Sequence, residues 1–187
     1  MFAFLGHVQW LPARLASWRL AVQEMKIYGV SFDMVGKQPI VLLKTADGKR
    51  FLPIWIGASE AAAIMARLQG TEAPRPMTHD LLQTVVDELG GTVVRIAVTE
   101  LRDNTFYAQI VLRANGDEHE IDSRPSDAIA LAVRVNAPIF AADDVIAESS
   151  IEFEGDPPDS DEAVVDEFRE FLEQVRPEDF RTEGGEG

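Results

Sequence analysis

Hydrophobic and polar residues alternate along several short segments of the chain, and between these segments the apolar positions change to helical spacing. A period of two predicts strands, whereas apolar residues three and four positions apart predict helices. The predicted strands span residues 26–34, 38–45, 50–56, 92–101, 105–113, 118–122 and 138–141, and the predicted helices span 59–69, 78–89 and 125–136. This order of elements indicates the α+β class.

The order of three strands followed by a helix occurs twice. Residues 59–64 read Ser-Glu-Ala-Ala-Ala-Ile, and residues 126–131, which lie 67 positions later, read Ser-Asp-Ala-Ile-Ala-Leu. A hairpin signal precedes each copy, Asp-Gly at 47–48 and Asn-Gly at 115–116. The repeat predicts a duplicated β-β-β-α unit that forms one compact domain. Because such units usually fold about a pseudo-two-fold axis, we expect the two helix starts to face one cleft.

Residue types at the helix ends and on the helix faces give further expectations. Ser59 and Thr78 are predicted N-caps, because a hydroxyl at that position can accept a hydrogen bond from a helix N–H group. The helix over 78–89 carries an apolar stripe that we expect to be buried, formed by Leu81, Leu82, Val85, Val86 and Leu89. Trp55, beside Pro53, is expected in the core or in an interface rather than in base stacking. The edges of so many short strands need cover, which predicts a homo-oligomer.

Charge divides the chain unevenly. From Asp143 onward there are 17 acidic residues against 3 arginines (−14), which leaves 15 acidic and 14 basic residues (−1) in the rest. We therefore expect an N-terminal extension over residues 1–24, a domain over 25–151, and an acidic tail with one amphipathic helix over 152–187. Without a dense cluster of Lys and Arg, the composition does not indicate high-affinity binding to nucleic acid.

Composition also excludes some classes of protein. The chain has no run of eighteen apolar residues, so a membrane-spanning helix is not expected. It has no cysteine, which excludes disulfides, thiolate metal sites and a cysteine nucleophile. The predicted location is the cytoplasm, with which the absence of cysteine agrees.

Four sequence blocks together resemble the bifunctional nuclease family of bacteria and plants. They are Met-Lys-Ile-Tyr-Gly-Val from Met25, Leu-Pro-Ile-Trp-Ile-Gly from Leu52, Arg-Pro-Met-Thr-His-Asp-Leu from Arg75, and Asp-Ser-Arg-Pro-Ser-Asp-Ala-Ile-Ala-Leu from Asp122. The resemblance implies a compact duplicated α+β domain and, as described for some plant relatives, cleavage of both DNA and RNA. The site region that it implies comprises Glu60, His79, Asp80, Arg124, Ser126 and Asp127.

Phosphodiester hydrolysis needs a group that activates water and a group that neutralises developing charge. His79 is the first candidate for a general base or a metal ligand, with Asp80 beside it, although Thr-His-Asp at a helix start is also an ordinary capping sequence. Glu60 and Asp127 are equivalent in the repeat, and if the helix starts meet, their carboxylates can share Mg²⁺ or Mn²⁺. The alternative is that both carboxylates stabilise helix dipoles, by about 0.3–1 kcal/mol each, without a metal.

Arg124 is the candidate for substrate binding, together with Ser126 and Arg75. An arginine before a proline is held extended, and at a helix start it suits a phosphate, although an ion pair with Asp127 or Glu60 explains it equally well. Two functions therefore remain open. The resemblance favours a nuclease that acts on DNA or RNA. The near-neutral body and the absence of a complete catalytic triad favour a non-catalytic module that binds a small anion or a protein partner.

Overall fold

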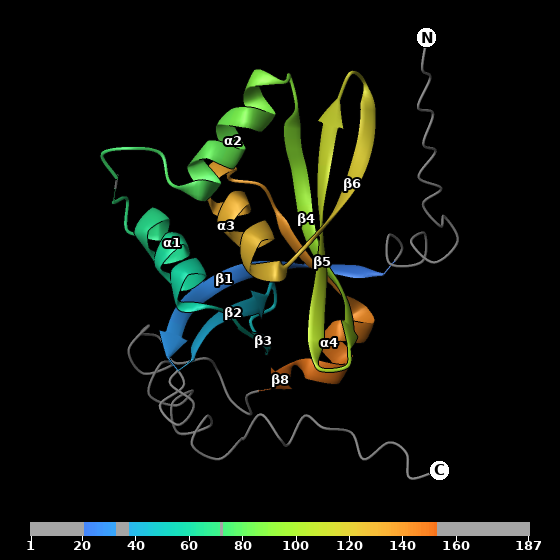
Figure 1. Ribbon diagram of the computed structural model, residues 1–187. Helices are drawn as coiled ribbons and strands as arrows, with labels where there is room; N and C mark the ends of the chain where they lie inside the picture. The colour runs from blue at the N-terminus through green and yellow to red at the C-terminus, as the bar shows by residue number, and fades with distance from the viewer. Residues whose placement is uncertain (1–20, 33–37, 72, 153–187) are drawn as a thin grey trace.

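The computed structural model describes residues 21–32, 38–71 and 73–152, which form a sheet with helices packed on it (Figure 1). The strands are β1 (Val22–Phe32), β2 (Pro39–Thr45), β3 (Arg50–Trp55), β4 (Thr92–Arg102), β5 (Thr105–Ala114), β6 (Asp117–Ser123), β7 (Ile139–Ala142) and β8 (Ile151–Glu152). The helices are α1 (Ala58–Leu68), α2 (Thr78–Glu88), α3 (Pro125–Val135) and α4 (Asp143–Ser149).

The sheet contains two antiparallel meanders on either side of a short central strand. Its order is β6-β5-β4-β7-β1-β2-β3-β8. β7 pairs antiparallel with β1 and parallel with β4, so it joins the meander β1–β3 to the meander β4–β6. Each meander leads into a helix, α1 after β3 and α3 after β6. The predicted α+β class is therefore confirmed. This symmetric order suits a repeated unit, but the duplication itself stays a prediction.

Tight turns hold the hairpins of the second meander in register. Asp103 and Asn104 between β4 and β5 have φ values of 51° and 56°, and Asn115 and Gly116 between β5 and β6 have 54° and 91°. Two successive left-handed residues form the turn whose twist matches that of paired strands, and Asn, Asp and Gly adopt this conformation most readily. Asn104 is thereby held at one end of the sheet, next to the end of β3 described below.

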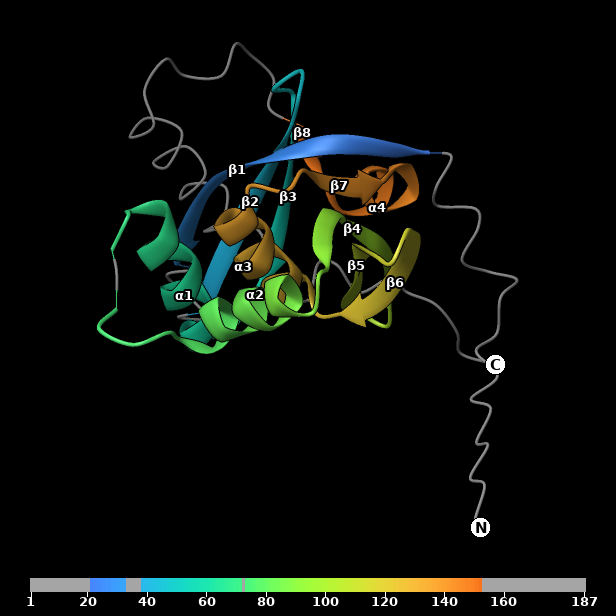
Figure 2. The ribbon, with the colours of Figure 1, turned by 90° about the horizontal axis from the view of Figure 1, so that it is seen from above.

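Three helices pack beside one another, with α3 in contact with both α1 and α2 (Figures 1 and 2). α3 is the most buried, and its small residues Ala128, Ala130 and Ala132 allow its neighbours to approach closely. Ile129 and Leu131 belong to the main core cluster, which also includes apolar side chains from both meanders. α4 lies apart from these helices, next to β7 (Figure 2). The core therefore centres on α3.

The apolar stripe of α2 is largely exposed, so the prediction that it is buried is wrong. Leu81, Leu82, Val85 and Leu89 are 56%, 38%, 46% and 76% exposed. Among the stripe residues, Val86 packs against the main core. The physical reason is that α2 lies outside α3, which already covers the centre of the sheet. Helical periodicity reveals an apolar face, but it does not show whether anything covers that face.

The N-caps of two helices also differ from the prediction. Gly57 and Met77 are the N-caps of α1 and α2. Ser59 is the second residue of α1, and Thr78 is the first residue of α2. In α2 the cap is supplied from within, because the Asp80 carboxylate accepts a hydrogen bond of 2.8 Å from the Met77 backbone N–H. A carboxylate three residues into the helix thus satisfies a backbone donor at its start.

The regular structure at the two ends of the described chain differs from the predicted elements. β1 begins at Val22, so residues 22–24 of the predicted extension pair with β7. α4 and β8 were not predicted, because seven and two residues are too short to show a period, although Val145 and Ile146 of α4 are buried. The predicted tail helix lies outside the described residues. Within the described ranges, no helix is long and apolar enough to cross a membrane.

Candidate functional site

One guanidinium joins the starts of α1 and α3. Arg124, the N-cap of α3, donates from Nε to Asp127 Oδ2 at 2.8 Å and from Nη2 to Asp127 Oδ1 at 3.2 Å. The same Nη2 lies 3.1 Å from Glu60 Oε1 in the first turn of α1. The expected convergence of the two helix starts is confirmed. The alternative of an ion pair for Arg124 is also confirmed, and both Glu60 and Asp127 take part in it.

His79 brings the start of α2 to the same place. It is the second residue of α2 and is 8% exposed, and its Nε2 lies 3.1 Å from Asp127 Oδ1. Each helix start carries a partial positive charge, which adds to that of Arg124 and favours anions. Glu60, His79, Arg124 and Asp127 therefore form one hydrogen-bonded group, which we call the Arg124 cluster.

Asp127 and Arg124 of the cluster are both ionised at neutral pH. Burial of Asp127 raises the pKa of its carboxyl, but the hydrogen bonds from Arg124 and His79 outweigh this effect and hold the pKa below its ordinary value. The Asp127 hydrogen bond, and then the Glu60 hydrogen bond, raise the pKa of Arg124. Asp127 is thus a carboxylate and Arg124 a cation over the whole physiological range.

The donor set does not fit the shared metal ion that the sequence suggested. Both carboxylate oxygens of Asp127 accept from Arg124, and Oδ1 also contacts His79. In the described part of the chain, no three His, Cys, Asp or Glu side chains gather as metal ligands. Mg²⁺ or Mn²⁺ would have to displace the guanidinium that lies between the carboxylates. Their metal-binding role stays a prediction that this arrangement does not support.

Asp80 lies outside the Arg124 cluster and pairs with Arg134 instead. Its Oδ1 accepts a 2.6 Å hydrogen bond from Nε of Arg134, and its Oδ2 accepts from the Met77 N–H. Arg134 is only 6% exposed and also donates to the carbonyls of Ala130 and Ala63, so the pair fastens α2 and α1 to α3. The Met77 hydrogen bond, followed by that of Arg134, lowers the pKa of Asp80. A catalytic role for Asp80 stays a prediction, and these contacts favour a structural one.

The predicted substrate-binding residues are divided between two places. Arg75 is exposed and lines a pocket of about 620 Å³ together with Asp80 and Arg134. Ser126 is buried and lies beside Arg124 on a groove of about 390 Å³. The structure therefore groups Ser126 with Arg124 and places Arg75 in a different pocket.

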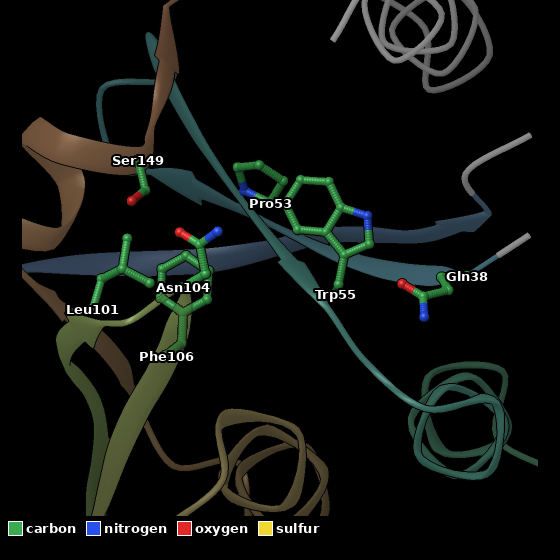
Figure 3. A pocket seen from close by; sticks show the side chains of 7 residues that line it. All are labelled: Gln38, Pro53, Trp55, Leu101, Asn104, Phe106 and Ser149. Carbon is green, nitrogen blue, oxygen red and sulfur yellow. The ribbon is translucent and has the colours of Figure 1, made fainter. Parts of the chain in front are cut away.

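The groove continues away from the helix starts toward β3 and the β4–β5 hairpin. A second hollow of about 200 Å³, which we call the aromatic pocket, is lined by Gln38, Pro53, Trp55, Leu101, Asn104, Phe106 and Ser149 (Figure 3). Gln38, Trp55, Asn104 and Phe106 line both the groove and the aromatic pocket. Sequence reasoning named none of these four as a site residue, and it expected Trp55 in the core or in an interface. Asn104 was visible only as a turn residue, and no local pattern pairs it with a strand fifty positions earlier.

Comparisons with known proteins agree on one family. The family model for the bifunctional nuclease domain matches residues 41–154, which include the whole Arg124 cluster. An uncharacterized protein of Mycobacterium tuberculosis is 39% identical over 166 residues, covering 84% of this chain and 98% of that protein.

Relatives from plants carry a functional name. Bifunctional nuclease 1 of Arabidopsis thaliana is 33% identical over 105 residues, covering 54% of this chain and 32% of the plant protein. Bifunctional nuclease 1 of Oryza sativa subsp. japonica is 30% identical over 103 residues, covering 53% of this chain and 31% of the plant protein. With a family model that spans most of the domain and a relative that aligns along nearly its whole length, the chain belongs to the bifunctional nuclease domain family.

Proposed function

We propose that this protein is a nuclease that hydrolyses phosphodiester bonds of DNA, RNA or both. Membership of the family supports the reaction class. The observation that carries the proposal is Arg124, whose side chain is 66% exposed on the groove while two carboxylates hold its guanidinium at a helix start. A guanidinium and a helix start both bind phosphate oxygens through N–H groups.

In the proposed reaction, Arg124 holds a phosphate oxygen and neutralises the charge that develops on it. Glu60 and Asp127 fix the orientation of the guanidinium, so little reorganisation is needed in the transition state. With its hydrogen on Nε2, His79 donates to Asp127, which leaves Nδ1 as the nitrogen that accepts a proton from water. The hydroxide attacks phosphorus, and the bond from phosphorus to one sugar oxygen breaks. The imidazolium, which ionised Asp127 stabilises, returns its proton to that leaving oxygen.

The second candidate is a non-catalytic module that binds a small anion. Two observations favour it: His79 is buried and does not line the groove, and the members of the Arg124 cluster already satisfy one another. On this view His79 and Asp127 only join α2 to α3. The two functions differ in what the loss of His79 does to turnover.

His79→Gln tests the nuclease proposal. Glutamine retains an N–H donor for Asp127 but cannot act as a base near neutral pH, so we expect turnover of a single-stranded oligonucleotide to fall about a hundredfold. We expect the melting temperature to change little. Rates should be measured on purified protein with and without EDTA, which also tests the predicted metal.

The control for this experiment is His119→Gln, the same change at an exposed position of β6. Equal cleavage by the His79→Gln variant and the wild type would remove His79 from the mechanism. Activity abolished by EDTA would restore the metal hypothesis in place of the arrangement described above.

Gly57→Ala tests whether Glu60 positions Arg124. A Cβ at Gly57 would collide with the Glu60 carboxylate, while the backbone of Gly57, at φ −73°, accepts alanine without strain. We therefore expect α1 to persist and the carboxylate to leave Arg124. Turnover should fall by about the same factor as in Glu60→Gln, at nearly unchanged melting temperature. If Gly57→Ala retains full activity while Glu60→Gln does not, the glycine has no positioning role.

We also propose that the protein forms a homo-oligomer through α2. Its exposed stripe can pack on the same stripe of a second copy, which is how two-fold dimers form. The double variant Leu81→Gln, Val85→Gln should shift the mass in sedimentation velocity to that of a smaller species, and Glu88→Gln on the same helix should not. A wild-type protein that is monomeric at tens of micromolar would contradict this proposal.

A further inference from the structure

We infer that the aromatic pocket binds one unpaired base of a single-stranded nucleic acid whose phosphate lies at Arg124. The phosphate end of this inference rests on the proposed function. The base end rests on separate observations, namely the walls of the pocket, its polar groups and its continuity with the groove.

The walls of the pocket suit a flat aromatic ring. Pro53 and Trp55 of β3 form one side, and Leu101 and Phe106 of the β4–β5 hairpin form the other (Figure 3). Apolar and aromatic side chains on both sides of the pocket favour a planar ligand. Every nucleobase offers a π face to such walls, whatever its identity.

Polar groups of the pocket match the edges of a base. Gln38 and Asn104 each carry an amide, which both donates and accepts hydrogen bonds, as base edges do. Ser149 is 4% exposed, and its hydroxyl oxygen has no hydrogen-bond partner among the described residues. Because buried hydroxyls are normally satisfied, a polar ligand group in the pocket is the simplest partner for it.

The pocket opens into the groove that carries Arg124. The two hollows share four lining residues, and the groove, at about 390 Å³, falls within the usual range of small-ligand sites, about 300–1,000 Å³. A base in the pocket would therefore have its sugar in the groove and its phosphate beside Arg124 and Ser126. Bases in a duplex are paired and stacked and cannot enter such a pocket without being extruded. The arrangement thus selects single strands.

The test measures binding of the full-length protein to two labelled decamers by fluorescence anisotropy, in EDTA and at one fixed salt concentration. Both decamers carry phosphorothioate linkages, which keep the backbone charge but resist hydrolysis. One decamer is oligothymidine, and the other has the same backbone with abasic sites, so the two carry equal charge. Since stacking of one base is worth about tenfold in affinity or more, we expect wild type to bind oligothymidine about tenfold more tightly. Arg124→Gln should weaken both complexes equally and keep this ratio.

Two variants locate the base. Phe106→Leu removes a ring but keeps apolar volume, and Asn104→Gly removes the amide but retains a residue suited to φ 56°. Phe106→Leu should bring the affinity ratio close to one, and Asn104→Gly, which removes one hydrogen bond, should lower the ratio about fivefold. The matched control is Asn115→Gly, the same change in the other hairpin turn, at φ 54° and outside the lining of both hollows. This control should keep the tenfold ratio.

Equal wild-type affinity for the two decamers would overturn the inference, and so would a tenfold ratio that survives in both pocket variants. Either result would leave the pocket to another ligand, such as an apolar side chain of a protein partner. The proposed function can fail separately. A tenfold ratio without any cleavage removes the nuclease and keeps the base pocket, whereas cleavage with a ratio of one does the reverse.

Discussion

Replacing Arg124 by glutamine is expected to lower the turnover of oligonucleotides about a thousandfold, the largest effect on activity that we predict. A positioned donor that meets developing charge contributes about a hundredfold to a thousandfold in rate, and here the donor also carries the positive charge. Glutamine is neutral, so it also leaves the Glu60 and Asp127 carboxylates to repel the phosphate. The loss should therefore appear in both kcat and kcat/KM.

The control for Arg124 is Arg113→Gln, which removes an exposed arginine that forms a 2.9 Å ion pair with Glu118 on the adjacent strand. This variant changes the net charge by the same amount and should retain wild-type kinetics. Arg124→Lys should recover only part of the rate, because lysine cannot bridge two carboxylates with a planar fork. If Arg124→Gln keeps a tenth or more of wild-type turnover, Arg124 is only a tether between α1 and α3.

Replacing Asp80 by asparagine is expected to cause the largest loss of stability, about 2 kcal/mol, with little change in specific activity. Arg134 is almost fully buried, so removal of its charged partner leaves a guanidinium with an incomplete set of acceptors. The usual cost for a fully buried pair is about 3–5 kcal/mol. We expect less here, because the Asp80 side chain is 38% exposed and water can take part of its place.

The measurement for Asp80 is the free energy of unfolding in urea, alongside the rate per folded molecule. Asp87→Asn is the matched control, because it makes the same change at an exposed position of the same helix. It should leave stability within about 0.5 kcal/mol of wild type. A specific loss of turnover in Asp80→Asn at unchanged stability would return Asp80 to the catalytic residues.

The same pair determines part of the pH dependence of stability. The pKa of Asp80 in the folded protein lies below its ordinary value of 3.8, so its contribution is present above that pH and is lost as pH falls through the folded pKa. Asp127 acts in the same direction. We therefore expect wild type to lose stability steeply below about pH 4, and Asp80→Asn to lose less over that window.

Local sequence was sufficient to predict most of the secondary structure. Strands β2 to β7 and helices α1 and α3 could be predicted to within one or two residues, because their period and turn signals depend only on neighbouring positions. The repeated Ser-Glu and Ser-Asp helix starts also indicated that Glu60 and Asp127 would converge. They do converge, on Arg124.

The exposed face of α2 and the separate roles of His79 and Asp80 depended on tertiary structure. Helical periodicity placed Leu81 and Val85 on an apolar face of α2, but only the packing of α3 against the sheet leaves that face uncovered. Adjacent residues His79 and Asp80 point to partners two turns apart on α3, Asp127 and Arg134, which separates two residues that the sequence had grouped.

The aromatic pocket depended on tertiary structure most of all. Trp55 and Phe106 lie 51 positions apart and come together because β3 and the β4–β5 hairpin end near each other, on opposite meanders of the sheet. The sequence by itself determined the elements, the turns and the meeting of two helix starts, since each of these follows from local spacing or from the repeat. Which side chains share a cavity, and which charges pair, was decided by long-range packing that no local pattern encodes.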